Sequence, residues 1–205
     1  FKTNTTPGNN AWGGNDLMLG TAIAAVNNDD YAYFSITVNE GYLLSLTQIA
    51  PYNIRHSSTG PTAGQWQYQV GSGDFVNIGT EITWGSVTNA TGNPQSAIDL
   101  SGISALQNVS AGIKITIRVA IWGGTGTTGT WYFNGNGSVP LILNGSICEI
   151  PSLSFPVSII NKVEGDVPFT QAATSNSSGT ISYSSDNSSI ASVNSATAEV
   201  TLGTT

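Results

Sequence analysis

The residues of this chain best suited to bind a ligand are amides, aromatic rings and a few cationic side chains. Arg55 and His56 directly precede a turn, and Gln67 lies in a run where glutamine alternates with apolar residues. Arg118 occupies the polar side of a second alternating run, which Trp122 ends beside a glycine-rich loop. Amides and guanidinium groups form hydrogen bonds, and aromatic rings stack on the C–H faces of sugars. If these runs share one sheet, they predict a shallow sugar-binding surface.

Each candidate also has a structural interpretation. Arg55 and Arg118 could form an ion pair or hydrogen bonds to loop carbonyls. Tyr132 alternates with Trp131 and Phe133, and we expect the Trp/Phe set to be buried, as we do Trp66 and Tyr68. The predicted ligand-binding residues are Arg55, His56, Gln67, Arg118, Trp122 and Tyr132.

Catalytic chemistry has few candidates. His56 is the single histidine, and Cys148, the single cysteine, is interpreted as a buried structural thiol. A glycosidase needs only two carboxylates, but most candidates adjoin turn residues, which explains them without catalysis. These candidates are Asp16, Asp29, Asp30, Glu40, Asp74, Glu81, Asp99 and Glu149. We therefore predict a non-catalytic protein and leave a polysaccharide-degrading enzyme open as an alternative.

One cluster of oxygen-bearing side chains could hold a metal ion. Asn28, Asp29 and Asp30 precede an expected strand, and carboxylate and amide oxygens are the ligands that Ca²⁺ takes. An Asx-rich turn explains the same residues without a metal. A structural calcium is the only cofactor that the sequence suggests, because one His and one Cys exclude the usual zinc sites.

Period-two alternation of apolar and polar residues predicts an all-β protein. Residues 31–38 place Phe34 and Ile36 on one face. The run 113–121 alternates so regularly that it predicts a core strand with one solvent-exposed face. Further strands are expected at 42–47, 65–70, 75–78, 81–84, 130–134 and 139–144, and a helical turn near Ile103–Asn108. This spacing predicts an antiparallel, jelly-roll-like β-sandwich.

The pattern restarts around Cys148–Pro151, which predicts two domains, residues 1–149 and 150–205. Dense short strands with hydroxyl-rich turns suggest that the second is a small immunoglobulin-like sandwich. Its expected strands are Ser158–Val163, Pro168–Ala173, Thr180–Ser184, Ile190–Val193 and Ala198–Leu202.

Composition excludes several function classes. Asn, Ser, Thr and Gly make up 92 of the 205 residues, only 8% of residues are charged, and the formal net charge is −7. Without a basic cluster, binding to nucleic acid or anionic lipid is not expected. The sequence contains no apolar run of transmembrane length and no signal peptide. A start at Phe1 suggests a processed or excised fragment of an exported protein, so we expect a secreted or cell-surface location.

Two stretches of the second domain, Asp-Val-Pro-Phe-Thr at 166–170 and the run from Ile181 to Val193, resemble a bacterial immunoglobulin-like (Big) domain. This resemblance implies a non-catalytic spacer or adhesion unit. The family pattern continues with another strand, so the likeness implies a domain that lacks its last strand. Either the chain is truncated there, or another chain pairs with the open edge.

Four stretches of the first domain, 30–38, 55–66, 99–102 and 129–133, resemble N-terminal β-sandwich modules of secreted Bacteroidetes-type multidomain proteins. Such modules look like jelly-roll carbohydrate-binding modules, so the likeness implies a secreted accessory module and suggests sugar binding. An acidic residue often follows the closing aromatic run; here Asn134 stands instead, so the likeness carries no metal role there.

We therefore expect non-catalytic, extracellular recognition of a polysaccharide or cell-surface glycan through aromatic stacking and amide or guanidinium hydrogen bonds. The alternative is a structural subunit of a surface layer, sheath or filament, assembled by strand-edge pairing. The expected partners are accordingly glycans or neighbouring subunits, and the identity of the glycan stays open.

Overall fold

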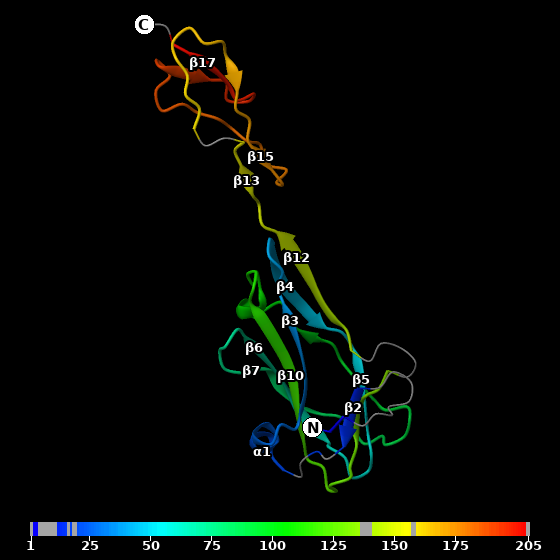
Figure 1. The fold of residues 1–205 in the computed structure, drawn as a ribbon. Coiled ribbons are helices and arrows are strands. Elements are labelled where there is room, and N and C mark those ends of the chain that lie inside the picture. Colours follow the sequence, from blue (N-terminus) through cyan, green and yellow to red (C-terminus); the bar gives the residue numbers. More distant parts are fainter. Residues whose placement is uncertain are drawn as a thin grey trace. The chain divides into compact units, whose positions relative to one another are not determined.

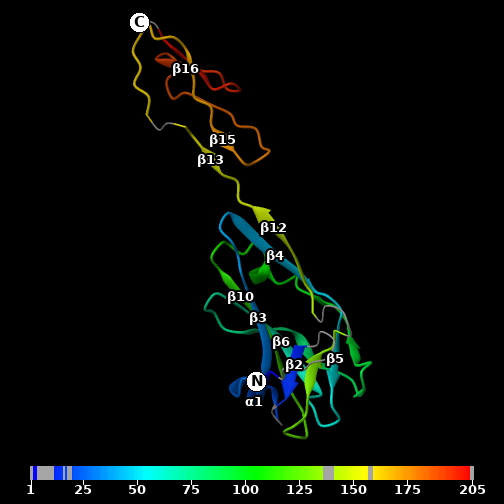
Figure 2. The same cartoon turned by 45° about the vertical axis from the view of Figure 1, so that its right-hand side comes forward.

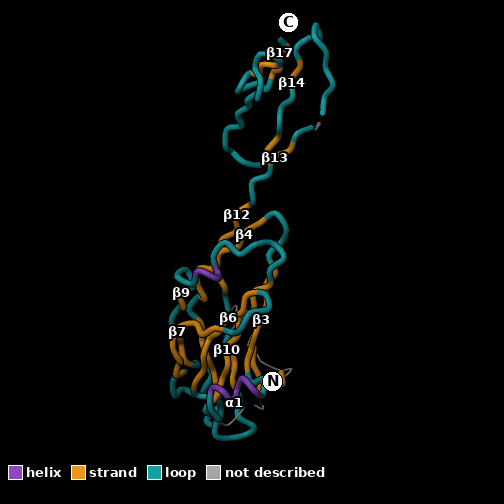
Figure 3. Tube along the Cα trace, turned by 90° about the vertical axis from the view of Figure 1, so that its left-hand side faces the viewer, coloured by secondary structure: helices purple, strands orange, loops and turns teal. Residues whose placement is uncertain are grey.

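Alternating apolar and polar residues form antiparallel strands throughout this chain. A computed structural model describes residues 2–3, 12–15, 17, 20–135, 141–156 and 159–203. In these residues every strand pair is antiparallel, and helix is confined to two short segments, drawn purple in Figure 3. The all-β fold class is therefore confirmed. Neither described helix has the length and apolar character that crossing a bilayer requires.

The chain divides into two units where the sequence pattern restarts. Unit 1 comprises residues 1–149 and unit 2 residues 150–205.

One layer of unit 1 is a four-stranded sheet. Its spatial order is β3 (Tyr31–Thr37), β10 (Lys114–Trp122), β6 (Ala63–Val70) and β7 (Val76–Thr83). Ile115, Ile117, Val119 and Ile121 of β10 are fully buried on its inner face, and Trp66 of β6 is 1% exposed. Since successive side chains alternate across a strand, the residues between them point to the outer face.

The second layer contains two sheets. Their strands are β1 (Lys2–Thr3), β2 (Trp12–Asn15), β11 (Trp131–Phe133), β5 (Tyr52–His56) and β8 (Asn93–Gln95) in one, and β12 (Leu143–Glu149), β4 (Tyr42–Ile49) and β9 (Ile98–Asp99) in the other. Figure 2 shows β3 and β10 on one side of unit 1 and β2 and β5 on the other.

The inner faces of the two layers meet in one aromatic core. The ring centroid of Phe133 lies 4.8 Å from that of Trp131 and 5.8 Å from that of Trp66. The predicted sandwich and the predicted burial of these three rings are confirmed; Tyr68, also expected in the core, is half-buried and packs against it.

The outer face of β10 is covered, which corrects the expectation of a half-exposed strand. Thr116, Arg118 and Ala120 are 6%, 7% and 2% exposed. The helix α1 (Ala22–Asn27) packs over Ala120 and Trp122. Figure 1 shows α1 beside the end of β10. The alternation of β10 therefore separates two packed faces, not a buried face from a solvated one.

Helix α1 lies where no helix was expected. Thr21 caps it, accepting a hydrogen bond from the backbone N–H of Ala24 at 3.4 Å, and alanines with high helix propensity follow the cap. Six residues are too few to show helical periodicity, so the cap is the signal that could have revealed it. The expected turn near Ile103–Asn108 is present as the 3₁₀ helix η1 (Ser104–Leu106).

Two other expectations for unit 1 are corrected. Cys148 is exposed, because it lies on β12 at the edge of its sheet. The expected strands 75–78 and 81–84 form the single strand β7. The strand expected at 139–144 lies partly outside the described residues, and β12 begins at Leu143.

Unit 2 consists of short strand pairs and long loops (Figure 3). The strands are β13 (Leu153–Ser154) paired with β15 (Thr174–Ser175), and β14 (Phe169–Thr170), β17 (Glu199–Leu202) and β16 (Ala191–Val193) in a second sheet. The strands expected at 168–173, 190–193 and 198–202 are present in shorter form as β14, β16 and β17. Residues 180–184 and 159–163 are loops instead, and Ser158 lies outside the described residues.

Candidate functional site

A pocket of about 420 Å³ lies between α1 and the outer face of β6, β7 and β10; we call it the α1 pocket. Its apolar lining comes from Ala22, Ile23, Val26, Ala120 and Trp122, and its polar lining from Asn27, Gln65, Gln67, Asn77 and Glu81. Two predicted ligand-binding residues, Gln67 and Trp122, are thus brought together. The pocket sets a wall of amides and one carboxylate against an apolar floor.

An irregularity in the pairing of β6 with β7 places the polar wall. The register shifts at Gln65, which faces residues 79–81 of β7 as a group. Gly79 has a φ of +64°, a left-handed conformation that glycine adopts at little cost. Glu81 belongs to this bulged segment and lines the pocket instead of pairing in the ladder. The bulge therefore brings a carboxylate beside the glutamines of β6.

The amide of Gln67 is held at both ends. Its Nε2 donates to Asn77 Oδ1 at 2.8 Å, and its Oε1 accepts from Arg118 Nε at 2.8 Å. Gln67 and Arg118 are also direct neighbours in the β6–β10 register. A side-chain amide fixed by two partners presents a defined hydrogen-bonding surface and loses little entropy when a ligand binds. Gln67 is thus the best-ordered polar group of the pocket wall.

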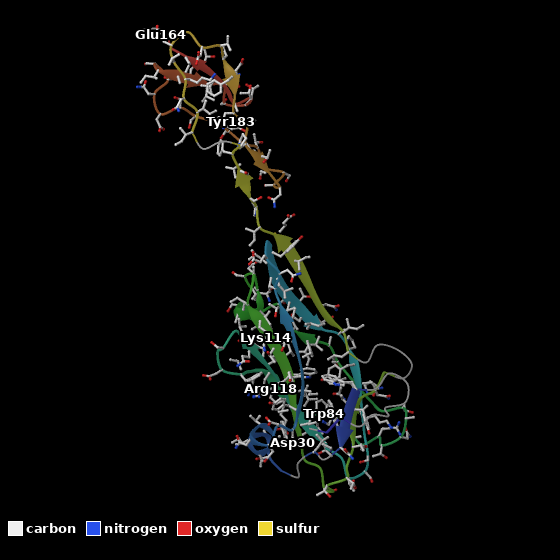
Figure 4. All side chains as sticks on the ribbon, viewed as in Figure 1. Asp30, Trp84, Lys114, Arg118, Glu164 and Tyr183 are labelled. Atoms are coloured by element: carbon white, nitrogen blue, oxygen red, sulfur yellow. The ribbon has the colours of Figure 1, made fainter. Side chains whose placement is uncertain are left out.

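Arg118 stands behind Gln67, enclosed by aromatic rings. Its guanidinium carbon lies 3.5 Å from the ring centroid of Phe75 and 4.8 Å from that of Tyr31. Figure 4 shows Arg118 midway along β10, between Lys114 and Asp30. Burial lowers the pKa of Arg118, and the rings offset part of that cost through cation–π attraction. Arg118 orders the site from behind and does not line the pocket.

A hydrogen bond extends this cluster toward the end of α1. The hydroxyl of Tyr31 donates to Asp29 Oδ1 at 2.9 Å. Burial, followed by this hydrogen bond, raises the pKa of Tyr31, so the phenol stays protonated and keeps donating. A chain of contacts therefore runs from Asp29 through Tyr31 and Arg118 to Gln67.

Trp122 is 7% exposed, since most of its ring packs in a cluster with Ala25 and Ala63. So small an exposed area does not provide a broad stacking platform.

Arg55 and Tyr132 lie on the other layer of the sandwich, so the condition that all six residues share one sheet is not met. They are direct neighbours across β5 and β11. Arg55 is exposed and Tyr132 is half-buried. They form a separate pair on the outer face of that sheet, apart from the α1 pocket.

His56 joins neither group. It is 4% exposed, its Nδ1 lies 2.9 Å from the carbonyl oxygen of Ser57, and its Nε2 lies 3.0 Å from that of Gly85. Both ring nitrogens thus face backbone, and the ring ties β5 to the loop at Gly85.

The residues predicted to bind calcium are used in the turn after α1. Asn28 is the C-cap, and its Nδ2 donates to the carbonyl oxygen of Ala24 at 2.8 Å. Asp29 has a φ of +60° and accepts from Tyr31, and Asp30 is 2% exposed. The described residues contain no group of three His, Cys, Asp or Glu side chains that could hold a metal ion. The geometry supports the Asx-rich turn, and a calcium site stays a prediction without further support.

Several lining residues were not predicted as ligand-binding residues. Asn27 and the apolar residues of α1 depend on a helix that the sequence pattern did not reveal. Asn77 pairs with Gln67 in the regular register of β6 and β7, whereas Glu81 lies in the bulge of β7, for which Gly79 is the local signal in the sequence.

The chain was also compared with known proteins. No protein-family model, curated protein or solved structure matches it.

Proposed function

We propose that unit 1 is a non-catalytic module that recognises an extracellular polysaccharide or cell-surface glycan, and that the α1 pocket holds one sugar residue. The observation that carries this proposal is the fixed amide of Gln67 above the apolar floor formed by Ala120 and Trp122. Sugars present hydroxyls and C–H faces together, so they match a site that offers both kinds of surface. A volume of about 420 Å³ falls within the usual range of small-molecule sites.

The chemistry of the whole chain supports the same function. Only 8% of the residues are charged, which leaves neutral hydrogen bonding and apolar contact as the main means of recognition. The excess of Asn, Ser, Thr and Gly supports a secreted or cell-surface setting. Among the described lining residues Glu81 is the one carboxylate, whereas most glycosidases use a pair.

A glycan array followed by calorimetric titration tests the proposal. Gln67→Ala should weaken glycan binding about tenfold, the loss of roughly one well-placed hydrogen bond. Gln69→Ala is the matched control, because Gln69 shares the outer face of β6 but bonds to the carbonyl oxygen of Gly73, away from the pocket. Equal losses in both variants, or no binding to any glycan, would contradict the proposal. Release of reducing sugar that Glu81→Gln abolishes would establish the enzymatic alternative instead.

A second candidate function is assembly with neighbouring subunits through unit 2, as in a surface layer, sheath or filament. Unit 2 exposes many large apolar side chains, including Ile159 and Val167, which are 76% and 75% exposed. It also contains a groove of about 440 Å³ lined in part by Phe155, Tyr183 and Val200. Sedimentation over a dilution series tests this candidate. Polymers that dissociate on dilution would support it, and a monomer at high concentration would contradict it.

A further inference from the structure

We propose that the α1 pocket selects sugars that carry a free amino group and rejects sugars that carry carboxylates. This inference rests on the proposed glycan recognition and names the ligand class of the same pocket. It follows from the hydrogen-bonding groups and the charge that the pocket lining leaves to a ligand.

Two side chains of the polar wall, Gln65 and Glu81, offer a ligand acceptors and no donors. Gln65 spends its Nε2 on the carbonyl oxygens of Trp66 and Ile78, both at 2.9 Å, which leaves its Oε1 for a ligand. Glu81 as a carboxylate only accepts. Gln67 donates one N–H to Asn77 and accepts from Arg118, so its second N–H stays available to a sugar hydroxyl. A ligand group that donates several hydrogen bonds matches Gln65 and Glu81, and an ammonium group donates three.

The charge at the pocket also favours a cationic ligand over an anionic one. Among the described residues that line the pocket, Glu81 is the one with a charged side chain. The guanidinium of Arg118, on the neighbouring strand, is not free to meet a ligand carboxylate. Arg118 is 7% exposed, lies against Phe75 and donates from its Nε to Gln67. The carboxylate of Asp29, which accepts from the Tyr31 hydroxyl, offsets part of the positive charge of Arg118. A ligand cation therefore meets Glu81 directly, whereas a ligand carboxylate would meet Glu81 without an opposing accessible cation.

The apolar side of the pocket fits the remainder of such a sugar. Ile23 of α1 is 74% exposed although it lines the pocket, so it is available to cover a bound ring. Ala120 and Trp122 of β10 add to the apolar lining. The amino group would point to Gln65 and Glu81 while the C–H face of the ring contacts these apolar groups.

Titration with three trisaccharides tests the inference: one of glucosamine, one of N-acetylglucosamine and one of galacturonic acid. The measurement is made at low salt and at a pH of about 6, below the ordinary pKa of an amine, so that the amino sugar is cationic. The wild-type chain should bind the glucosamine trisaccharide at least about tenfold more tightly than the N-acetylated one, and the galacturonate most weakly. This preference should shrink as salt is added, because Glu81 is exposed.

Glu81→Gln should remove the preference for the amino sugar while keeping the shape of the pocket. Glu40→Gln is the matched control, since this substitution removes the same charge from the chain. Glu40 is exposed and lies in the turn between β3 and β4. Loss of the preference in Glu81→Gln alone supports the inference. A preference that persists in Glu81→Gln, or one that falls equally in both variants, overturns it.

The result also separates this inference from the proposed function. If all three trisaccharides bind equally and Gln67→Ala weakens each of them, glycan recognition stands and the selectivity is wrong. If none of them binds and the glycan array is blank, both proposals fail.

Discussion

The two units share a composition rich in turn residues, yet they bury very different amounts of apolar side chain. In the described part of unit 1, twenty buried residues form one core that includes Trp66, Trp131 and Phe133. In the described part of unit 2, Ala173 and Ala198 are the buried apolar residues. Large side chains of unit 2 such as Ile190 stay exposed. Unit 1 contains strands of eight and nine residues with regular alternation, whereas the strands of unit 2 have two to four residues.

This difference locates the stability of the chain and divides its candidate functions. Because burial of apolar surface is the dominant favourable term in folding, most of the folding free energy resides in unit 1. A small domain also buries a smaller fraction of its surface. Unit 1 therefore contains the packed pocket on which the proposed recognition rests, and unit 2 presents exposed apolar groups of the kind that the second proposal invokes.

Removing one core ring from unit 1 should have the largest effect. Phe133→Ala should lower the free energy of unfolding by about 3–5 kcal/mol, because the ring is fully buried against Trp12, Tyr52 and Trp131. All five tryptophans lie in unit 1, so urea unfolding followed by tryptophan fluorescence reports unit 1 selectively.

The matched variant in unit 2 is Phe169→Ala. Phe169 is half-buried, with Lys162 Nζ 5.1 Å from its ring centroid. The tryptophan-monitored transition should therefore be unchanged in this variant, while amide hydrogen exchange within unit 2 accelerates. A shift of that transition comparable to the effect of Phe133→Ala would show that the two units unfold together, and the contrast between them would fail.

The sequence predicted the layers of unit 1 because their determinants are local. In β10 the core residues from Ile115 to Ile121 recur every second position, as do Trp66, Tyr68 and Val70 in β6, and this period assigns them to one face. The positions of Gln67 and Trp122 on the pocket side follow from the same period. The exposed loops of unit 2 carry weaker alternation, which is why residues 180–184 were wrongly expected to form a strand.

The other features of the pocket depend on long-range packing. Nothing near Arg118 indicates that Phe75 and Tyr31 enclose it, since those rings come from other segments of the chain. Glu81 lies in the segment of β7 where the pairing with β6 shifts, and a sequence period cannot predict such a register shift. The strand partners of Arg55 are likewise set by topology, which placed it on the opposite layer.

A smaller effect is expected at alkaline pH from Tyr52 in the core of unit 1. Burial raises the pKa of Tyr52 to about 12 from its ordinary value of 10. The protonated phenol therefore stabilises the fold fully below pH 10, and this contribution is lost as the pH rises through about 12. The loss amounts to about 2–3 kcal/mol for a shift of this size.

Tyr52→Phe removes that alkaline loss from unit 1. The variant should also cost about 1–3 kcal/mol at neutral pH, because Trp66 Nε1 loses its acceptor, the Tyr52 hydroxyl at 2.9 Å. Unfolding midpoints between pH 8 and 12 should then fall less steeply than in the wild type. Tyr183→Phe, the corresponding change in unit 2, should leave the tryptophan-monitored transition unaltered. An equally steep fall in Tyr52→Phe would show that this phenol does not control the alkaline limit.

The smallest effect concerns a turn motif that the two units build with different chemistry. In unit 1 the Asp99 carboxylate accepts from Ser101 Oγ at 2.7 Å and from its backbone N–H at 2.9 Å. In unit 2 the neutral amide of Asn187 accepts from the backbone N–H of Ser189 at 3.1 Å. The Ser101 hydroxyl, followed by its backbone N–H, lowers the pKa of Asp99. The charged turn therefore stabilises unit 1 above the ordinary carboxyl pKa, and this contribution is lost as the pH falls through the lowered value.

Asp99→Asn gives unit 1 the neutral chemistry of the turn in unit 2. The variant should be slightly less stable than the wild type at neutral pH, and the difference should vanish under acid conditions, as followed by tryptophan fluorescence in urea. Ser101→Ala keeps the carboxylate but removes the hydroxyl donor, so it should shift the acid dependence in the same direction and by less. A constant difference between Asp99→Asn and the wild type at every pH would mean that the turn contributes through its shape alone, and the carboxylate of unit 1 would then have no advantage over the amide of unit 2.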